Sequence, residues 1–206
     1  LAERFGGYNY LDDAHGTSVF GQKGAGYVHA ELGNRLPPRV IMVGALSKAF
    51  GAHGGFIAGE RAMTDFVRKQ SVTYAFGGPP SLPGIAAALA SSEIHLRGEV
   101  DRLQEELRFK LSEFDRILGS GLVNSGTPFP IRGYVTGGEN ETIQSTKTLH
   151  AAGIACTAAL FPTVALGSAM LRFAISVKHT SGDFHRLKVA LDSARSATLA
   201  HASVCA

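Results

Sequence analysis

The sequence predicts an α/β protein, with a strand-rich part up to about residue 95 and a smaller α+β part after it. Three observations support this prediction. Residues 39–46, RVIMVGAL, form a continuous apolar run of strand length, as expected for a strand covered on both faces. Between residues 96 and 118, apolar residues recur every three or four positions, which is the pattern of one helix face. Beyond residue 128, segments typical of strands and of helices alternate.

The first part contains several short elements. YNYLDDAHG (8–16) indicates a short strand that runs into polar residues and then a glycine. Residues 16–39 are rich in glycine and contain two adjacent prolines, so we expect a surface excursion there. After the apolar run, GGFIAG (54–59) indicates a second buried strand, residues 61–70 have helix-forming composition, and FGGPPSLPG (76–84) indicates a rigid loop.

The second part begins with helix. From Ile85 the pattern is helical; Gly98 weakens that helix or breaks it, and Gly119-Ser-Gly ends it. Its apolar stripe is Leu96, Val100, Leu103, Leu107, Leu111, Phe114 and Leu118. The expected elements after it are strand FPIRGYVT, helix NETIQSTKTLHAAG, strands IACTA and AMLRFAISV, and a helix that begins at TSGD. We therefore predict two domains, residues 1–95 and 96–206.

Composition excludes several classes of protein. Of the 206 residues, 45% are hydrophobic and 18% charged, and the net charge of +3 is dispersed, which argues against nucleic acid or an anionic membrane surface as partner. No apolar run has the length of a membrane span, and the N-terminus lacks a signal-peptide layout. Cys156 and Cys205 fit no metal spacing, so we expect a reduced, cytoplasmic compartment. The chain does not begin with Met, and we expect it to be a piece of a longer protein.

Lys48 is the first candidate for chemistry. In MVGALSKAFGAHGG it follows a predicted strand and precedes glycines that let backbone approach a ligand closely. Strand ends in an α/β sheet are common ligand sites, and a partly buried lysine amine becomes a nucleophile that forms Schiff bases with carbonyls. The alternative interpretation is a solvated loop lysine.

Asp12 and His15 add a carboxylate and an imidazole. They lie at the end of the preceding predicted strand, and a parallel arrangement would bring them beside the strand that leads to Lys48. These three groups suit pyridoxal 5'-phosphate (PLP), because a carboxylate against the pyridine nitrogen keeps the ring an electron acceptor. Alternatively, Asp12 or Asp13 caps a turn and His15 is an ordinary loop residue.

Three motifs in order resemble one family. LDDAHGTSVFGQKGAG, VGALSKAFGAHGGFIAG and FPTVALGSAMLRFAISVKHT are similar to segments of the α-oxoamine synthase family of fold type I PLP-dependent enzymes. The resemblance implies the C-terminal portion of a fold type I transferase, like that of aspartate aminotransferase. This portion would comprise part of the large-domain sheet and a small α+β C-terminal domain.

The resemblance also implies residue roles. Asp12 would pair with the pyridine nitrogen, and His15 would contact the phenolic oxygen of PLP. Lys48 would be the Schiff-base lysine and the main acid and base, and Arg172 would bind the carboxylate of the amino-acid substrate through its planar guanidinium. Without the resemblance, Arg172 is best interpreted as a strand arginine at an exposed edge. No metal site is expected.

The chain departs from the family around the phosphate. Ala45 stands where the family has a threonine that holds the phosphate, and YAFGGPP replaces a hydroxyl-rich loop. Ser47 is a polar neighbour, and backbone N–H groups of Gly77 and Gly78 could substitute, so we assign all three to cofactor binding. Met170 replaces the first arginine of the family's RLR. These changes suggest an outlying branch.

The activity implied by the resemblance is acyl transfer. A PLP-dependent enzyme would condense an amino acid with an acyl-CoA thioester, usually with decarboxylation, to give an α-amino ketone. The implied assembly is a homodimer with sites at the interface. One alternative is a fold type I aminotransferase, which uses the same lysine and aspartate. Another is an inactive fragment or structural subunit that lacks the N-terminal half of the site.

Other motifs are weak. GQKGAG lacks the spacing of a dinucleotide-binding loop. The sequence contains no G-x-S-x-G elbow, so a serine hydrolase is not predicted. The remaining histidines are scattered and show no metal spacing. Among them His179 matches a family histidine, and its role stays open.

Overall fold

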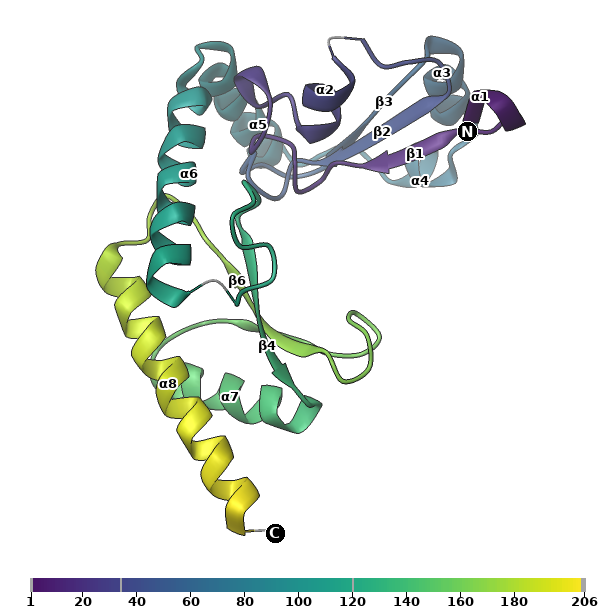
Figure 1. Cartoon of the computed structure of the whole chain (residues 1–206). Coiled ribbons are helices and arrows are strands. Elements are labelled where there is room, and N and C mark those ends of the chain that lie inside the picture. The colour runs from purple at the N-terminus through teal and green to yellow at the C-terminus, as the bar shows by residue number, and fades with distance from the viewer. Residues whose placement is uncertain (1, 34, 120, 205–206) are drawn as a thin grey trace. The chain divides into compact units, whose positions relative to one another are not determined.

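The computed structural model describes residues 2–33, 35–119 and 121–204. The chain divides into two compact units, residues 1–104 and 105–206, and each is described by itself (Figure 1). The division falls inside helix α6 (Glu99–Leu118), whereas the sequence places it after residue 95. In the part of the chain that is described, none of the helices combines the length and the apolar character needed to cross a membrane.

The sheet of the first unit has three strands in the order β1-β2-β3. Strands β1 (Asn9–Asp12) and β2 (Val40–Ala45) are parallel, and β3 (Gly55–Ala58) runs antiparallel to β2. All three strands were predicted from the sequence and are confirmed, but the prediction that β3 is buried is wrong, because its residues are exposed or half-buried. Residues of β2 alternate between buried and half-buried, so one face of this sheet is covered more fully than the other.

The first unit also contains several helices, most of them short. They are α1 (Ala2–Phe5), the 3-10 turn η1 (Gln22–Gly24), α2 (Tyr27–Leu32), α3 (Arg61–Gln70), α4 (Val72–Phe76) and α5 (Leu82–Leu96). Ser81 begins α5 because its hydroxyl accepts a hydrogen bond from the Gly84 N–H. The prediction of a surface excursion for residues 16–39 is wrong for residues 16–28 and is confirmed for the described residues between 29 and 39, which are exposed or half-buried. The whole segment contains η1 and α2, and Thr17, Ser18 and Val28 are buried.

A break separates α5 from α6. Arg97 caps α5, and Gly98 follows with φ +78°, a left-handed conformation that glycine adopts without strain. The break at Gly98, one of the two outcomes considered from the sequence, is therefore present. The predicted apolar stripe does not extend across the break: Leu96 at the end of α5 is 72% exposed, whereas Val100, Leu111 and Phe114 of α6 are buried.

The second unit combines an antiparallel sheet with three helices. Strands β4 (Ile131–Gly137), β6 (Ala169–Ala174) and β5 (Thr157–Ala159) lie in that order, and α7 (Glu139–Ala151) and α8 (Ser181–Val204) join α6 (Figure 1). The prediction of a strand over residues 154–158 is wrong at its start. The Ile154 N–H donates to the Leu149 carbonyl at 2.9 Å and closes the end of α7, so pairing begins only at Thr157.

The core of the second unit lies between the three helices and one face of the sheet. Leu171 and Phe173, two residues apart on β6, point to this face together. The buried core comprises Leu111, Phe114, Ile117, Leu122, Leu149, Leu171, Phe173, Ile175, Phe184, Leu187, Ala190 and Leu191. Cys156 is half-buried beside it as a free thiol, and Cys205 lies outside the described residues.

Candidate functional site

Asp12 and His15 follow directly from the first strand. Asp12 is the last residue of β1, and both side chains are exposed. One carboxylate oxygen of Asp12, Oδ1, accepts a hydrogen bond from the Ala14 N–H at 2.9 Å. Asp12 therefore caps the turn at the strand end, which was the alternative interpretation from the sequence. The bond leaves the other carboxylate oxygen, Oδ2, available for a ligand.

Lys48 lies in the loop between β2 and β3. The Leu46 N–H donates to the Gly54 carbonyl at 2.9 Å, and the Ala52 N–H donates to the Leu46 carbonyl at 2.7 Å, so the loop has its own hydrogen bonds. Gly51 follows with φ +74° and donates its N–H to the Lys48 carbonyl at 2.9 Å. The Lys48 side chain is exposed, in contrast to the partial burial considered from the sequence.

The sheet brings Asp12 and the Lys48 loop to one edge. β1 and β2 are parallel with Asp12 beside Val43, so both strands end at the same edge, as the sequence predicted. Paired residues point to the same face, and side chains alternate along a strand, so Asp12, Val43 and Ala45 share one face. Asp12 is exposed on this face and Val43 and Ala45 are half-buried, whereas Met42 on the opposite face is 3% exposed.

The residues assigned to the phosphate lie near two turns. Ser47 is exposed and directly precedes Lys48. Gly77 caps the C-terminal end of α4, and Gly78 follows with φ +70°; both are exposed. Their assignment to cofactor binding stays a prediction.

Arg172 lies in the second unit on strand β6. β6 is the central strand of its sheet, because it pairs with β4 through Gly133 and with β5 through Thr157. The interpretation of Arg172 as an arginine at a sheet edge is therefore wrong. Its neighbours Leu171 and Phe173 point into the core, so the exposed guanidinium belongs to the opposite face of the sheet.

Asp13 is a buried acid that sequence analysis did not separate from Asp12. Its side chain is 4% exposed and accepts a hydrogen bond from the Val28 N–H at 3.3 Å, at the start of α2. Burial raises the pKa of Asp13, although backbone hydrogen bonds from Val28 and Tyr27 act in the opposite direction. A Cβ on Gly16 or Gly26 would lie within about 2 Å of its carboxylate, so both glycines make room for this acid.

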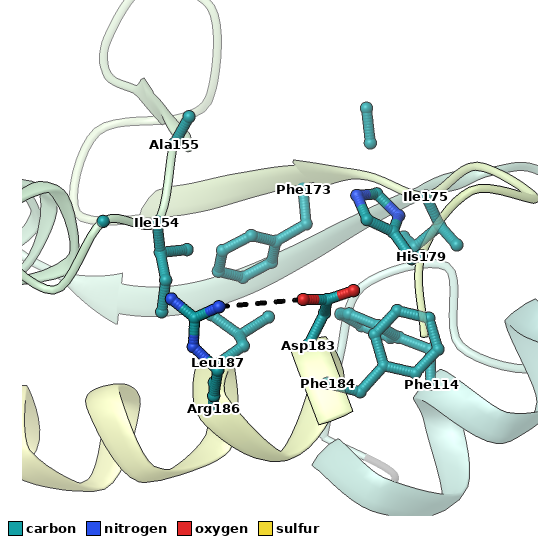
Figure 2. Close-up of a pocket in the computed structure, with 12 residues that line it drawn as sticks. Phe114, Ile154, Ala155, Phe173, Ile175, His179, Asp183, Phe184, Arg186 and Leu187 are labelled. Atoms are coloured by element: carbon teal, nitrogen blue, oxygen red, sulfur yellow. Dashed lines mark ion pairs between the residues drawn. The ribbon is translucent and has the colours of Figure 1, made fainter. Parts of the chain in front are cut away.

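A pocket of about 230 Å³ lies within the second unit between the start of α8 and the sheet. Figure 2 shows Phe114, Phe173 and Phe184 in its wall, with the pair of Asp183 and Arg186 at 3.8 Å on its rim. His179 also lines it, and its Nδ1 accepts a hydrogen bond from the Ser176 N–H at 3.1 Å.

The acid in the pocket, Asp183, already accepts hydrogen bonds at the start of its own helix. Hydrogen bonds from the Thr180 N–H and hydroxyl hold the pKa of Asp183 below its usual range. None of the side chains assigned from the sequence to a cofactor or substrate lines this pocket. Within the described ranges, no group of three or more histidine, cysteine or acidic side chains could hold a metal ion.

Comparison with known proteins places these residues in context. Residues 1–191 match the family model for aminotransferase class I and II. An 8-amino-7-oxononanoate synthase from Nitrosococcus oceani is 36% identical over 193 residues, which are 91% of this chain and 49% of the relative. The chain spans about half the length of the curated relatives it matches.

Solved structures agree on the fold. A serine palmitoyltransferase from S. paucimobilis, solved with a bound PLP–myriocin adduct, has a TM-score of 0.74 at 24% identity; the match covers 95% of this chain and 49% of that one. An 8-amino-7-oxononanoate synthase from Francisella tularensis has a TM-score of 0.73 at 22% identity, covering 92% and 55%. These likenesses confirm the predicted fold over about half the length of a fold type I enzyme.

Proposed function

Because the chain belongs to the aminotransferase class I and II family, we propose that it carries the lysine and aspartate of a PLP site for acyl transfer. The reaction joins an amino acid to an acyl-CoA thioester and forms an α-amino ketone, usually with loss of carbon dioxide. One observation carries the proposal: Asp12 and the Lys48 loop follow the ends of adjacent parallel strands. The 8-amino-7-oxononanoate synthases among the relatives favour this reaction over others of the family.

The groups at this edge fit PLP by their chemistry. Asp12 offers a carboxylate oxygen to a pyridine N–H, and Lys48 offers an amine to an aldehyde. His15, three residues after Asp12, is assigned to the phenolic oxygen. Ser47 and the N–H groups of Gly77 and Gly78 are assigned to the phosphate. When bound, PLP supplies the electron sink that makes loss of an α-proton from an amino acid feasible near neutral pH.

Each side chain then has a defined task. Lys48 would hold the cofactor through its amine, and its Nζ would take the α-proton of the amino acid. Asp12 keeps a proton on the pyridine nitrogen by its negative charge, because an adjacent carboxylate favours the protonated ring. Arg172 donates two parallel hydrogen bonds to the substrate carboxylate and so orients the amino acid.

The proposal includes an assembly and a compartment. We assign a homodimer, supported by large exposed apolar side chains in the first unit: Phe76 is 85% exposed, Leu82 81% and Leu89 62%. Light scattering after size exclusion should give twice the mass of the chain, and a monomer under all conditions would overturn this assignment. The low number of cysteines, two in 206 residues, is in keeping with a cytoplasmic protein.

The test of the activity separates the candidate reactions. The protein is mixed with PLP, a panel of amino acids and acyl-CoA thioesters, and free CoA and amino ketone are measured. Release of both, lost in Lys48→Ala and retained in Lys69→Ala, is the expected result. Lys69 is an exposed lysine on α3 and serves as the matched control. Amino-group transfer to a keto acid without CoA release would instead identify an aminotransferase.

A non-catalytic subunit is the second candidate, favoured by the half-length match to the relatives. Visible absorbance after addition of PLP distinguishes it. A band that requires Lys48 supports a working site in this chain. Absence of any band, with no CoA release, supports the non-catalytic candidate.

A further inference from the structure

We propose that His95 is a positioning residue for the Lys48 site, because its ring joins the loop after β1 to the loop after β2. Asp12 and His15 stand at the start of the first loop, and Lys48 lies in the second. The inference therefore rests on the function proposed above. His95 belongs to the last turn of α5, and sequence analysis gave it no role.

Both ring nitrogens of His95 have partners. Nδ1 lies 2.7 Å from the carbonyl oxygen of Ser91, one turn earlier on α5, and Nε2 lies 2.9 Å from the hydroxyl oxygen of Ser18. A carbonyl oxygen only accepts, so Nδ1 carries the hydrogen, and in the neutral ring Nε2 accepts from the Ser18 hydroxyl. The environment thus determines the tautomer of His95.

Ser18 is the residue through which His95 holds the first loop. It is 6% exposed and has φ +70°, a left-handed conformation that is uncommon for serine. Its N–H donates to the Gly24 carbonyl at 2.9 Å, and its own carbonyl accepts from the Gln104 side chain at 3.1 Å. With His95 on the hydroxyl, every polar group of Ser18 is bonded, and these bonds maintain the unusual backbone.

A serine hydroxyl next to a histidine also suggests a nucleophile. The burial of Ser18 argues against that role, because a substrate carbonyl needs access to the hydroxyl oxygen. The Ser18–His95 bond is therefore assigned to loop structure.

The His95 ring also contacts the Lys48 loop. The rings of His95 and Phe50 have centroids 4.8 Å apart and are tilted by 33°. The Ser91 hydroxyl donates to the Phe50 carbonyl at 2.6 Å. Phe50 follows Lys48 by two residues, so α5 holds the lysine loop through both the ring and the backbone of Phe50.

This arrangement affects catalysis through position. The Lys48 side chain is exposed, so the backbone of its loop sets where the amine reaches. A displacement of about 1 Å in a catalytic group can lower a rate by about 100-fold. We expect loss of the His95 contacts to lower kcat about 10- to 100-fold with a smaller change in KM, because substrate binding by Arg172 is not affected.

The test uses two His95 variants and a matched control. His95→Phe retains a ring against Phe50 and loses both hydrogen bonds, and His95→Gln retains an acceptor for Ser18 and loses the ring. His185 on α8 is the control, because its Nδ1 also lies 2.8 Å from a serine carbonyl one turn earlier, Ser181, and its side chain is exposed. His185→Phe and His185→Gln should change nothing.

The first readout is amide hydrogen exchange in the chain without PLP. His95→Phe should speed exchange about tenfold in residues 16–26 and less in residues 46–54, and His95→Gln should do the reverse, while the core of β2 keeps its protection. Faster exchange confined to the first loop in both variants would overturn the proposal, because His95 would then not join the two loops. Should the His95 variants not fold, Ser18→Ala removes one hydroxyl and is expected to speed exchange in the first loop, with a smaller effect in the second.

The second readout is the visible band with PLP and its dependence on Lys48. In His95→Phe the band should form more slowly or with about tenfold weaker affinity for PLP, and His95→Gln should restore part of it. No band in the unaltered chain would refute the proposed function, and the role of His95 at a PLP site with it. The exchange data would still decide whether His95 joins the two loops.

Discussion

The ion pair of Asp115 and Arg132 predicts a large effect of a single substitution on stability. Arg132 on β4 is 0% exposed, and its guanidinium binds both carboxylate oxygens of Asp115 on α6, at 2.7 Å through Nε and 2.9 Å through one terminal nitrogen. Its other hydrogen bonds go to the backbone carbonyls of Phe129, Thr127 and Ile131. The perturbation is Asp115→Ala.

The loss of stability depends on the groups that Asp115→Ala leaves without a partner. Asp115→Ala leaves a fully buried positive charge with carbonyl partners and no counter-charge, and loss of one partner of a buried pair typically costs about 3–5 kcal/mol. The Gly126 N–H also loses its acceptor, which lies at 2.9 Å. We therefore expect the free energy of unfolding to fall by about 3–5 kcal/mol.

Urea unfolding followed by circular dichroism measures this change. With a slope of about 2 kcal/mol per molar urea, the midpoint should fall by about 2 M. The control is Asp192→Ala, which breaks an exposed pair with Lys188 at 3.9 Å and should cost less than about 0.5 kcal/mol. A loss below about 1 kcal/mol for Asp115→Ala would refute the assignment of a buried charge that needs its partner.

The pH dependence gives an independent check. Burial alone would raise the pKa of Asp115, but the hydrogen bonds and charge of Arg132 and the bond from Gly126 outweigh it and lower the pKa below 3.8. A depressed carboxyl pKa stabilises the fold above the unfolded value and loses this stabilisation as pH falls through the folded value. The difference between the unaltered chain and Asp115→Ala should therefore shrink below about pH 4.

Three further predictions concern the first unit. Gly16→Ala should cost about 1–3 kcal/mol in urea unfolding, because its Cβ would lie 1.8 Å from Asp13 Oδ1; an unchanged midpoint would contradict this packing. The raised pKa of Asp13 favours the fold below 3.8 and loses this effect as pH rises through the folded value. Asp13→Asn should thus flatten the pH dependence of unfolding, and an unaltered profile would exclude a titrating Asp13. Ala45→Thr places a hydroxyl on the face of Asp12 and should tighten PLP binding about tenfold in an absorbance titration; weaker binding would show that the phosphate lies elsewhere.

Much of the fold could be predicted because its signals are local. RVIMVGAL is long enough and apolar enough to indicate strand β2, and GGFIAG indicates β3 across a glycine-rich turn. The surface position predicted for residues 16–28 is wrong because glycine frequency suggests exposure, while burial there depends on Asp13, Val28 and contacts with distant helices. The start of β5 was misplaced because a hydrogen bond of the α7 C-terminus uses the Ile154 N–H.

The candidate site shows the same division. Lys48 and Asp12 lie in short motifs, and their relation follows from the parallel pairing of two consecutive predicted strands. His95 could not be found this way. Its bond to Ser18 spans 77 positions, and that of Gln104 to the Ser18 carbonyl spans 86. No local periodicity indicates such contacts, so only the folded chain identifies them.

In the first sheet, the buried side chains of β2 and the candidate site residues lie on opposite faces. Val40 and Met42 are buried on one face of β2, and Gly44 on the same face leaves room for Phe56. Asp12 and Ala45 point to the other face, where burial is partial. A ligand on the open face can therefore be bound without disturbing the packed one. In the described part of the chain, the open face offers no fully buried side chains to the loops after β1 and β2. The residue that contacts both loops, His95, comes instead from helix α5.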